Sequence, residues 1–330
     1  MQNSHYNTYR GIFVSTFWKI FMIPNRNIVY TVPLTILSGL IVGLLFDTSG
    51  LRDYVLIVSI LMVYPLMIGL KISEIFNLKY IKLINTSLLI NFISIPLIAY
   101  LLGFMFLRNQ PELFAGLAII ALLPTGTMTV AFTLIAKGNV PASLQLTVVG
   151  LVIGAILAPW YLLVMVGQFI PIDLMQVFQT IFMVIFIPLI AGLITYYALL
   201  TKIPETTFKE KIKPKLPGFT AYGMIYIIFT SISINANRIV SDWHLLLLAV
   251  FVLFLFYIAI FSLSYFIGKR FYTRENCISL VYGTALRNLA IGLGLAVTTF
   301  GADAALMVAL CFLFQQQFAV QFGRIINKSN

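Results

Sequence analysis

The sequence predicts an all-α polytopic membrane protein with ten transmembrane helices. Hydrophobic residues make up 61% of the 330 residues and charged residues only 9%, so the chain is far more apolar than a soluble protein of this length. Apolar runs of about 20 residues recur, which is the length of helix that crosses the hydrocarbon core of a bilayer. Because membrane barrel strands alternate apolar and polar residues, these unbroken runs favour helices over a barrel.

Each of the ten spans is an apolar run bounded by charged or turn-forming residues. In order, the spans are expected at residues 28–46, 54–71, 83–106, 113–136, 141–167, 175–200, 218–235, 243–268, 277–299 and 303–323. The lead-in at 1–26 is polar to amphipathic and shows no small-residue cleavage pattern before the first span, so we expect no removable signal peptide.

We therefore expect a single transmembrane domain over 1–330. A first repeat of five spans covers about 28–167 and a second covers about 175–323. A Pro- and Lys-rich stretch at 201–217 is expected to form a cytoplasmic linker.

The basic residues are distributed very unevenly between the two sides of these spans. With the N-terminus in the cytoplasm, 17 of the 21 Lys and Arg residues fall in inside segments and only Arg52, Arg108 and Arg238 fall outside. The one remaining basic residue, Arg287, lies within a span. The positive-inside rule therefore predicts a multi-pass protein of the plasma membrane with both termini in the cytoplasm.

The polar composition excludes several other classes of protein. The net charge of +11 follows from membrane topology, so we expect no nucleic-acid partner. Two cysteines, Cys277 and Cys311, and two histidines, His5 and His244, provide neither a disulfide framework nor a metal site, and no cofactor is expected. No Asp, Glu or His lies in the middle of a span, which argues against a membrane enzyme and against proton coupling.

Two spans are interrupted at their centres by residues that break helices. Span four contains Leu123 to Thr129, with the sequence LPTGTMT, and span nine contains Gly283 to Asn288, with the sequence GTALRN. Each is the fourth span of its group of five, and an odd number of spans per group gives the two repeats opposite orientations. Matching interruptions of this kind indicate a transporter whose site lies between the broken helices. Two ordinary kinked helices are the simpler alternative.

Arg287 is the residue in this chain that most strongly indicates a site. An arginine near the centre of a bilayer costs about 2.5–3.5 kcal/mol on insertion scales. A chain retains such a residue when it faces a watery cavity, a counter-ion or an anionic ligand. The alternative is a structural brace that snorkels or binds only backbone carbonyls.

Several stretches resemble the superfamily that unites bile-acid:sodium symporters with arsenite permeases. They are Leu61 to Pro65, Asn91 to Ile93 with Pro96, Pro124 to Gly138, Ile187 to Gly192, and Thr299 to Gly301. The likeness covers nearly the whole chain and is nearer the arsenite-permease branch. It implies ten helices in two inverted five-helix repeats, with a panel domain and a core domain, and with spans four and nine crossing at the midplane.

This chain departs from both branches at the positions that bind the transported species. Arsenite permeases have a Cys after the span-four Pro and a Glu in span nine, where this sequence has Thr125 and Ala290. A thiolate suits a thiophilic metalloid, whereas a threonine hydroxyl is a hard and uncharged ligand.

In the sodium-symporter branch, Thr129 matches a Ser ligand and Ser143 and Thr147 are retained, but Gly283 replaces the Glu. Arg287-Asn288 stands where that branch has Gln-Asn, and Asn91 stands for a span-three Gln. A sodium site remains open, although its carboxylate ligand is lost.

We therefore predict a carrier for a small anionic solute that works by alternating access and is independent of sodium. The predicted residues form two sets. The substrate-binding set is Thr125, Gly126, Thr127, Arg287 and Asn288, and the ion-site-like set is Asn91, Thr129, Ser143, Thr147 and Thr284. Arg287 occupies the place of a sodium ion, donating to Asn91, Asn288 and backbone carbonyls, or binds the anion directly, and the two roles are compatible.

The other functions left open are an arsenite or antimonite efflux permease, a sodium-coupled organic anion symporter, and a channel or sensor. The expected surroundings are the lipid bilayer, with the chain as a monomer or homodimer.

Overall fold

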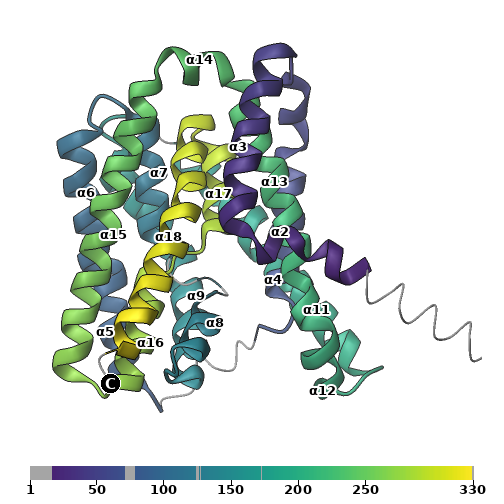
Figure 1. Cartoon of the computed structure of the whole chain (residues 1–330), viewed down its shortest axis with the longest axis vertical. Coiled ribbons are helices and arrows are strands. Elements are labelled where there is room, and N and C mark those ends of the chain that lie inside the picture. Colours follow the sequence, from purple (N-terminus) through teal and green to yellow (C-terminus); the bar gives the residue numbers. More distant parts are fainter. Residues whose placement is uncertain (1–16, 71–78, 124–125, 127, 172, 329–330) are drawn as a thin grey trace, which may run out of the picture.

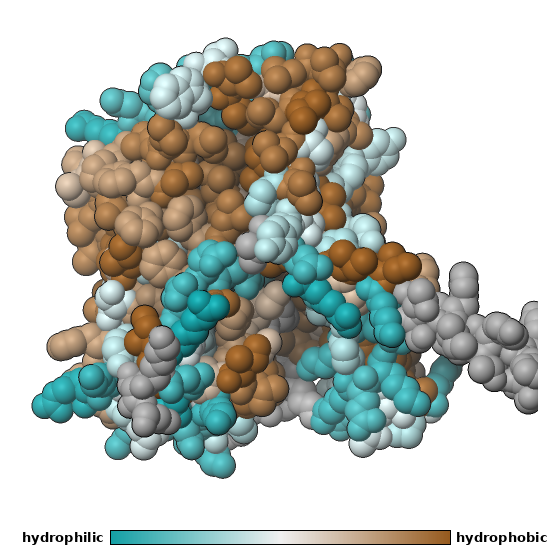
Figure 2. Space-filling model, viewed as in Figure 1, coloured by the Kyte–Doolittle hydropathy of each residue, from teal (hydrophilic) through white to brown (hydrophobic). Residues whose placement is uncertain are grey.

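The helices of the chain are long and apolar enough to place it in a membrane. The structure is a computed structural model that describes residues 17–70, 79–123, 126, 128–171 and 173–328. Within these residues, seven helices have the length and composition of a membrane span, and three shorter apolar helices accompany them. Apolar residues form a broad belt on the face in Figure 2, whereas hydrophilic residues gather mainly at its lower end. The chain is an integral, multi-pass membrane protein.

The elements follow the predicted spans closely. The first five predicted spans correspond to α3 (Ile28–Leu45), η1 (Ser49–Tyr54) with α4 (Val55–Met67), α5 (Ile81–Leu89) with η3 (Ile90–Ser94) and α6 (Ile95–Phe106), α7 (Pro111–Leu122) with α8 (Met128–Ile135), and α9 (Val140–Val166). A short helix, α2 (Ile23–Arg26), precedes them.

The last five correspond to α10 (Leu174–Ile181) with η4 (Phe182–Phe186) and α11 (Ile187–Leu200), α13 (Leu216–Ile234), α15 (Trp243–Phe271), α16 (Arg274–Ala285) with α17 (Leu289–Thr299), and α18 (Ala302–Lys328). The stretch expected to be a linker, 201–217, is largely helical. It contains α12 (Glu205–Thr207), η5 (Phe208–Ile212) and η6 (Lys213–Lys215). A further short helix, α14 (Ala236–Ser241), connects α13 to α15.

Among the described residues, the third and sixth predicted spans each contain a π-helical turn that ends two residues before a proline. Both η3 and η4 are π-helical, and they precede Pro96 and Pro188 respectively. Proline has no N–H to donate, so the carbonyl four residues earlier loses its helical partner. At Pro96 this carbonyl belongs to Phe92, and the hydroxyl of Tyr161 in α9 donates to it instead. The widened turn in η3 contains Asn91, a residue of the candidate site.

The helices pack into two groups. α3, α4, α11 and α13 pack on one another and lie on the right of Figure 1. On the left, α15 packs against α6, α16 and α18, and α7 packs against α6, α9 and α18. α17 lies between the groups, because it contacts α7 and α18 on one side and α4, α10 and α13 on the other.

The two predicted interruptions are real breaks in the helices. α7 ends at Leu122 and α8 begins at Met128, and α16 ends at Ala285 before α17 begins at Leu289. α7 and α17 occupy the upper half of Figure 1, and α8 and α16 occupy the lower half. The C-terminal ends of α7 and α16 therefore meet at mid-height, where the N-terminal ends of α8 and α17 begin.

Candidate functional site

Arg287 lies at this meeting point, only 1% exposed. Its guanidinium donates four hydrogen bonds to acceptors from three helical segments. Nε donates to the carbonyl of Ile120 at 2.8 Å, Nη1 to Oδ1 of Asn91 at 2.6 Å and to the carbonyl of Thr284 at 2.7 Å, and Nη2 to the carbonyl of Ala121. No ion pair to Arg287 occurs among the described residues, so its charge is balanced by dipoles.

The acceptors are available because each helix break leaves carbonyls without a helical donor. The carbonyl of Ile120 would accept from residue 124, which is a proline and has no N–H. The carbonyl of Thr284 would accept from Asn288, whose N–H donates to the carbonyl of Leu123 instead, at 2.9 Å. The last carbonyls of a helix also carry its negative dipole end. Arg287 thus caps the C-terminal ends of α7 and α16 together.

Gln315 of α18 holds the backbone of Arg287 from the other side. Its Oε1 accepts from the Arg287 N–H at 2.7 Å, and its Nε2 donates to the Arg287 carbonyl at 3.2 Å. The hydroxyl of Tyr257 in α15 donates to the same Oε1 at 3.2 Å. The sequence signals this role only as a run of three glutamines, because consecutive helical residues point in different directions and the run does not say which one faces the break.

Asn91 connects the third predicted span to the second break. Besides accepting from Arg287, its Nδ2 donates to the carbonyl of Gly283 at 3.2 Å and to Oγ of Ser87 at 3.1 Å. The predicted contact between Asn91 and Arg287 is present in the structure. Oδ1 of Asn91 therefore binds Arg287, while its Nδ2 binds both the end of α16 and the preceding turn of its own helix.

The remaining predicted substrate residues lie where the two breaks approach each other. A Cβ on Gly126 would lie 3.2 Å from the carbonyl oxygen of Arg287, so the two backbones are close. The expected bond from Arg287 to Asn288 is not among the described contacts. Oδ1 of Asn288 instead accepts from the N–H of Ile291 at 3.4 Å and caps the start of α17. Thr125 and Thr127 lie outside the described residues.

The four predicted hydroxyl ligands are buried, but each has a local protein partner. Thr129 donates to the carbonyl of Tyr282 at 3.2 Å, and Thr147 donates to the carbonyl of Ser143 at 2.8 Å. Oγ of Ser143 lies 2.7 Å from Oγ1 of Thr133, and Thr284 donates to Oγ of Ser264 at 2.7 Å. Thr284 joins the Arg287 site through its backbone carbonyl rather than its hydroxyl.

Broken helices whose polar ends meet inside the helix bundle are typical of secondary transporters. Irregular backbone is tolerated at that depth because it is buried in protein rather than exposed to lipid. Comparison with known proteins identifies the family. Residues 56–242, more than half of the chain, match the Sodium Bile acid symporter family. The chain belongs to this family.

Its relatives include proteins from both branches of the superfamily. The chain is 27% identical over 246 residues to the protein YbaS of Bacillus subtilis, covering 73% of this chain and 78% of YbaS. It is 22% identical over 280 residues to the arsenical-resistance protein Acr3 of Corynebacterium glutamicum, covering 80% and 74%. It is also 23% identical over 222 residues to the sodium-dependent transporter YocS of Bacillus subtilis, covering 65% and 64%.

Proposed function

We propose that the chain is a carrier for a small anionic solute. In this carrier, the guanidinium of Arg287 takes the place that a transported sodium ion has in sodium-coupled relatives. The observation that carries this proposal is the guanidinium bound to carbonyls of Ile120, Ala121 and Thr284 at the ends of two half-helices. In secondary transporters, C-terminal half-helix ends and unwound carbonyls coordinate the coupling cation. Arginine supplies the same positive charge permanently, because it does not deprotonate in proteins. Transport then needs no sodium.

The solute binds at the N-terminal ends of the half-helices that follow the two breaks. The N-terminal ends of α8 and α17 carry positive dipole ends, and half-helix N-termini of this kind attract anionic substrate groups. Gly126 and Asn288 lie next to these ends, and Thr125 and Thr127 complete the proposed substrate set. Arg287 contributes through its charge, since its described hydrogen bonds already engage protein acceptors.

Transport proceeds by alternating access between the two helix groups. The positions of the two breaks support ten spans in two inverted repeats. The broken helix α7–α8 is the fourth span of the first five, and α16–α17 is the fourth span of the second five. The end of α18 and the lysine-bearing elements around α12 lie at the lower end of Figure 1, and α14 lies at the upper end. This arrangement supports a cytoplasmic lower end that holds the C-terminus, in a plasma-membrane protein whose N-terminus is also cytoplasmic.

Two other substrates retain support from the comparisons. Acr3 is named for arsenical resistance, which supports an arsenite or antimonite exporter in which Thr125 has replaced the metalloid-binding thiol. YocS is named as sodium-dependent, which supports a sodium-coupled organic anion symporter. The hydroxyls of this alternative donate to backbone carbonyls or lie against another hydroxyl, which leaves their lone pairs available to a cation. The sodium-independent carrier is favoured instead because Gly283 stands where that branch has its carboxylate ligand.

A ligand screen by thermal shift on the purified chain tests the proposal. The panel contains monocarboxylates, dicarboxylates, inorganic oxyanions and arsenite, each with sodium or potassium as the cation. We expect at least one anion to stabilise the wild-type chain equally in both salts and to lose its effect on the Asn288→Ala variant. Stabilisation by arsenite alone, with arsenite resistance restored in a sensitive host, would establish the exporter instead.

A further inference from the structure

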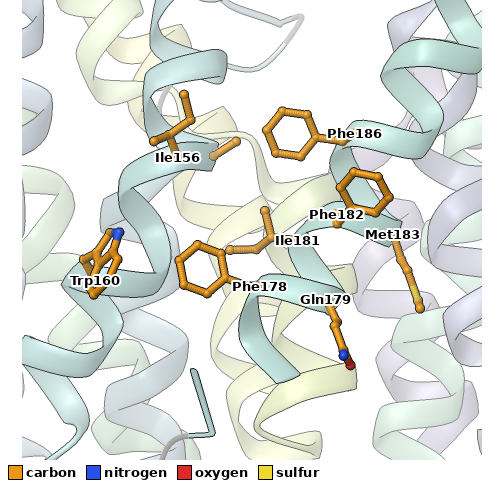
Figure 3. A pocket seen from close by; sticks show the side chains of 9 residues that line it. Ile156, Trp160, Phe178, Gln179, Ile181, Phe182, Met183 and Phe186 are labelled. Atoms are coloured by element: carbon orange, nitrogen blue, oxygen red, sulfur yellow. The ribbon is translucent and has the colours of Figure 1, made fainter. Parts of the chain in front are cut away.

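An apolar cavity of about 570 Å³ lies between α9 and the continuous segment formed by α10 and η4. Ala155, Ile156 and Trp160 line it from α9, and Phe178, Ile181 and Phe186 are among the residues that line it from the other segment. Figure 3 shows the rings of Phe178 and Phe186 directed toward α9, while the amide of Gln179 points away from them. The cavity is therefore an aromatic and aliphatic concavity with a polar group only at its margin.

The floor of this cavity is buried and its rim faces outward. Ala155 and Ile181 are each 2% exposed, whereas Ile156, Trp160 and Phe182 are each 54% exposed. Both helical segments are long and apolar enough to cross a membrane. The rim continues into the exposed apolar surface of the same helices, as at Val164, which is 74% exposed. The mouth of the cavity thus opens on the surface that the bilayer covers.

The cavity also lies where the two helix groups adjoin. α9 packs on α7, α8 and α16, whereas α10 and η4 pack on α4 and α17. An empty concavity at this seam would forfeit dispersion contacts along its whole lining, and water finds no set of polar partners there. A flexible hydrocarbon chain restores the contacts and can adapt if the two groups shift.

We propose that this cavity binds one acyl chain of a membrane phospholipid, as a specific site distinct from the surrounding annular lipid. The proposal depends on membrane embedding and on the cavity, and it is independent of the substrate and of Arg287. Aromatic side chains at the rim of the cavity would contact the acyl chain. The rings of Trp160 and Phe178 meet edge to face at 5.7 Å, and those of Phe182 and Phe186 stack at 6.1 Å.

Trp160 is a built-in reporter for this site, because the chain has only three tryptophans. The variant Trp18→Phe with Trp243→Phe leaves Trp160 as the sole fluorophore. Phosphatidylcholine with brominated acyl chains, which quench tryptophan on contact, is titrated into the purified full-length protein in detergent. We expect quenching that saturates near one lipid per protein. As the matched reporter, all three tryptophans are replaced by Phe and Val164 by Trp. Its quenching should rise in proportion to the lipid fraction without saturating.

Substitutions that fill the cavity test whether the lipid binds at this specific site or only contacts the protein surface. In the Trp160 reporter, Ile156→Phe should raise the half-saturating lipid concentration at least tenfold, whereas Val164→Phe on the same helix should leave it unchanged. Ala155→Leu, which fills the floor, is a second variant if the first folds poorly. Proportional quenching at Trp160, or saturable quenching that the filling variants leave intact, would overturn the proposal. Displacement of the bound lipid by a water-soluble anion would overturn it as well and assign the cavity to the solute.

Discussion

Replacing Arg287 by methionine tests whether the guanidinium holds the two broken helices together. Arg287→Met keeps most of the side-chain volume and removes four hydrogen bonds, so that three buried carbonyls and Oδ1 of Asn91 lose their donor. Each unsatisfied buried group costs about 1–3 kcal/mol. Local relaxation, and the removal of a charge whose burial is itself costly, recover part of this sum, so we expect a net loss of about 3–5 kcal/mol.

The chain contains its own probes for this measurement. Cys277 and Cys311 are both buried free thiols, so a thiol-reactive dye reports unfolding in detergent. At about 2 °C per kcal/mol, the Tm of Arg287→Met should fall by about 6–10 °C. Arg324 is exposed on α18, and Arg324→Met should change the free energy of unfolding by no more than about 0.5 kcal/mol. If the Arg287→Met and Arg324→Met variants melt together at the wild-type Tm, the guanidinium does not secure the helix ends.

Two further substitutions test the surroundings of Arg287. Gln315→Leu leaves the N–H and carbonyl of Arg287 without partners and should lower the free energy of unfolding by about 2–4 kcal/mol. Gln317→Leu, on the exposed face of α18, is the control and should have little effect in the same melting assay. Equal Tm values for both variants would remove Gln315 from the site. Gly126→Val forces a larger side chain against the Arg287 carbonyl and should destabilise by about 1–3 kcal/mol, whereas Gly50→Val meets open space and serves as the control. A Gly126→Val variant with wild-type stability and anion response would show that the two breaks need no close approach.

The helical framework was predictable because membrane helices must satisfy their backbone internally. Apolar length located the helices, and the Pro-Thr-Gly and Gly-Thr-Ala stretches located the two breaks. The contact between Asn91 and Arg287 was predicted through the family resemblance, in which Asn91 stands for a span-three Gln, and the structure contains it. The position of η3 agrees with its proline, although residue 96 alone indicates a kink rather than a π-helical turn.

The rest of the site depends on geometry that a residue pattern does not contain. The carbonyls of Ile120 and Ala121 bind Arg287, yet an apolar residue in a sequence gives no sign that its backbone is a ligand. Asn288 was also predicted to accept from Arg287, but its side-chain oxygen instead accepts from the N–H of Ile291 and caps α17. The hydroxyls of Thr133 and Ser264 were missed because their partners lie 10 and 20 residues away in the chain, across helix boundaries.

If Arg287 occupies the place of a mobile cation, its removal should make the stability of the chain depend on sodium. The Tm of the wild-type chain and of Arg287→Ala is compared in sodium chloride and in potassium chloride at equal ionic strength. We predict that the wild type melts at the same temperature in both salts. Arg287→Ala opens an oxygen-lined space and should gain sodium-specific stability, about 1.4 kcal/mol when sodium is at ten times its Kd. Sodium-specific stabilisation of the wild type, or no difference between the salts for Arg287→Ala, would show that Arg287 does not stand in for a cation.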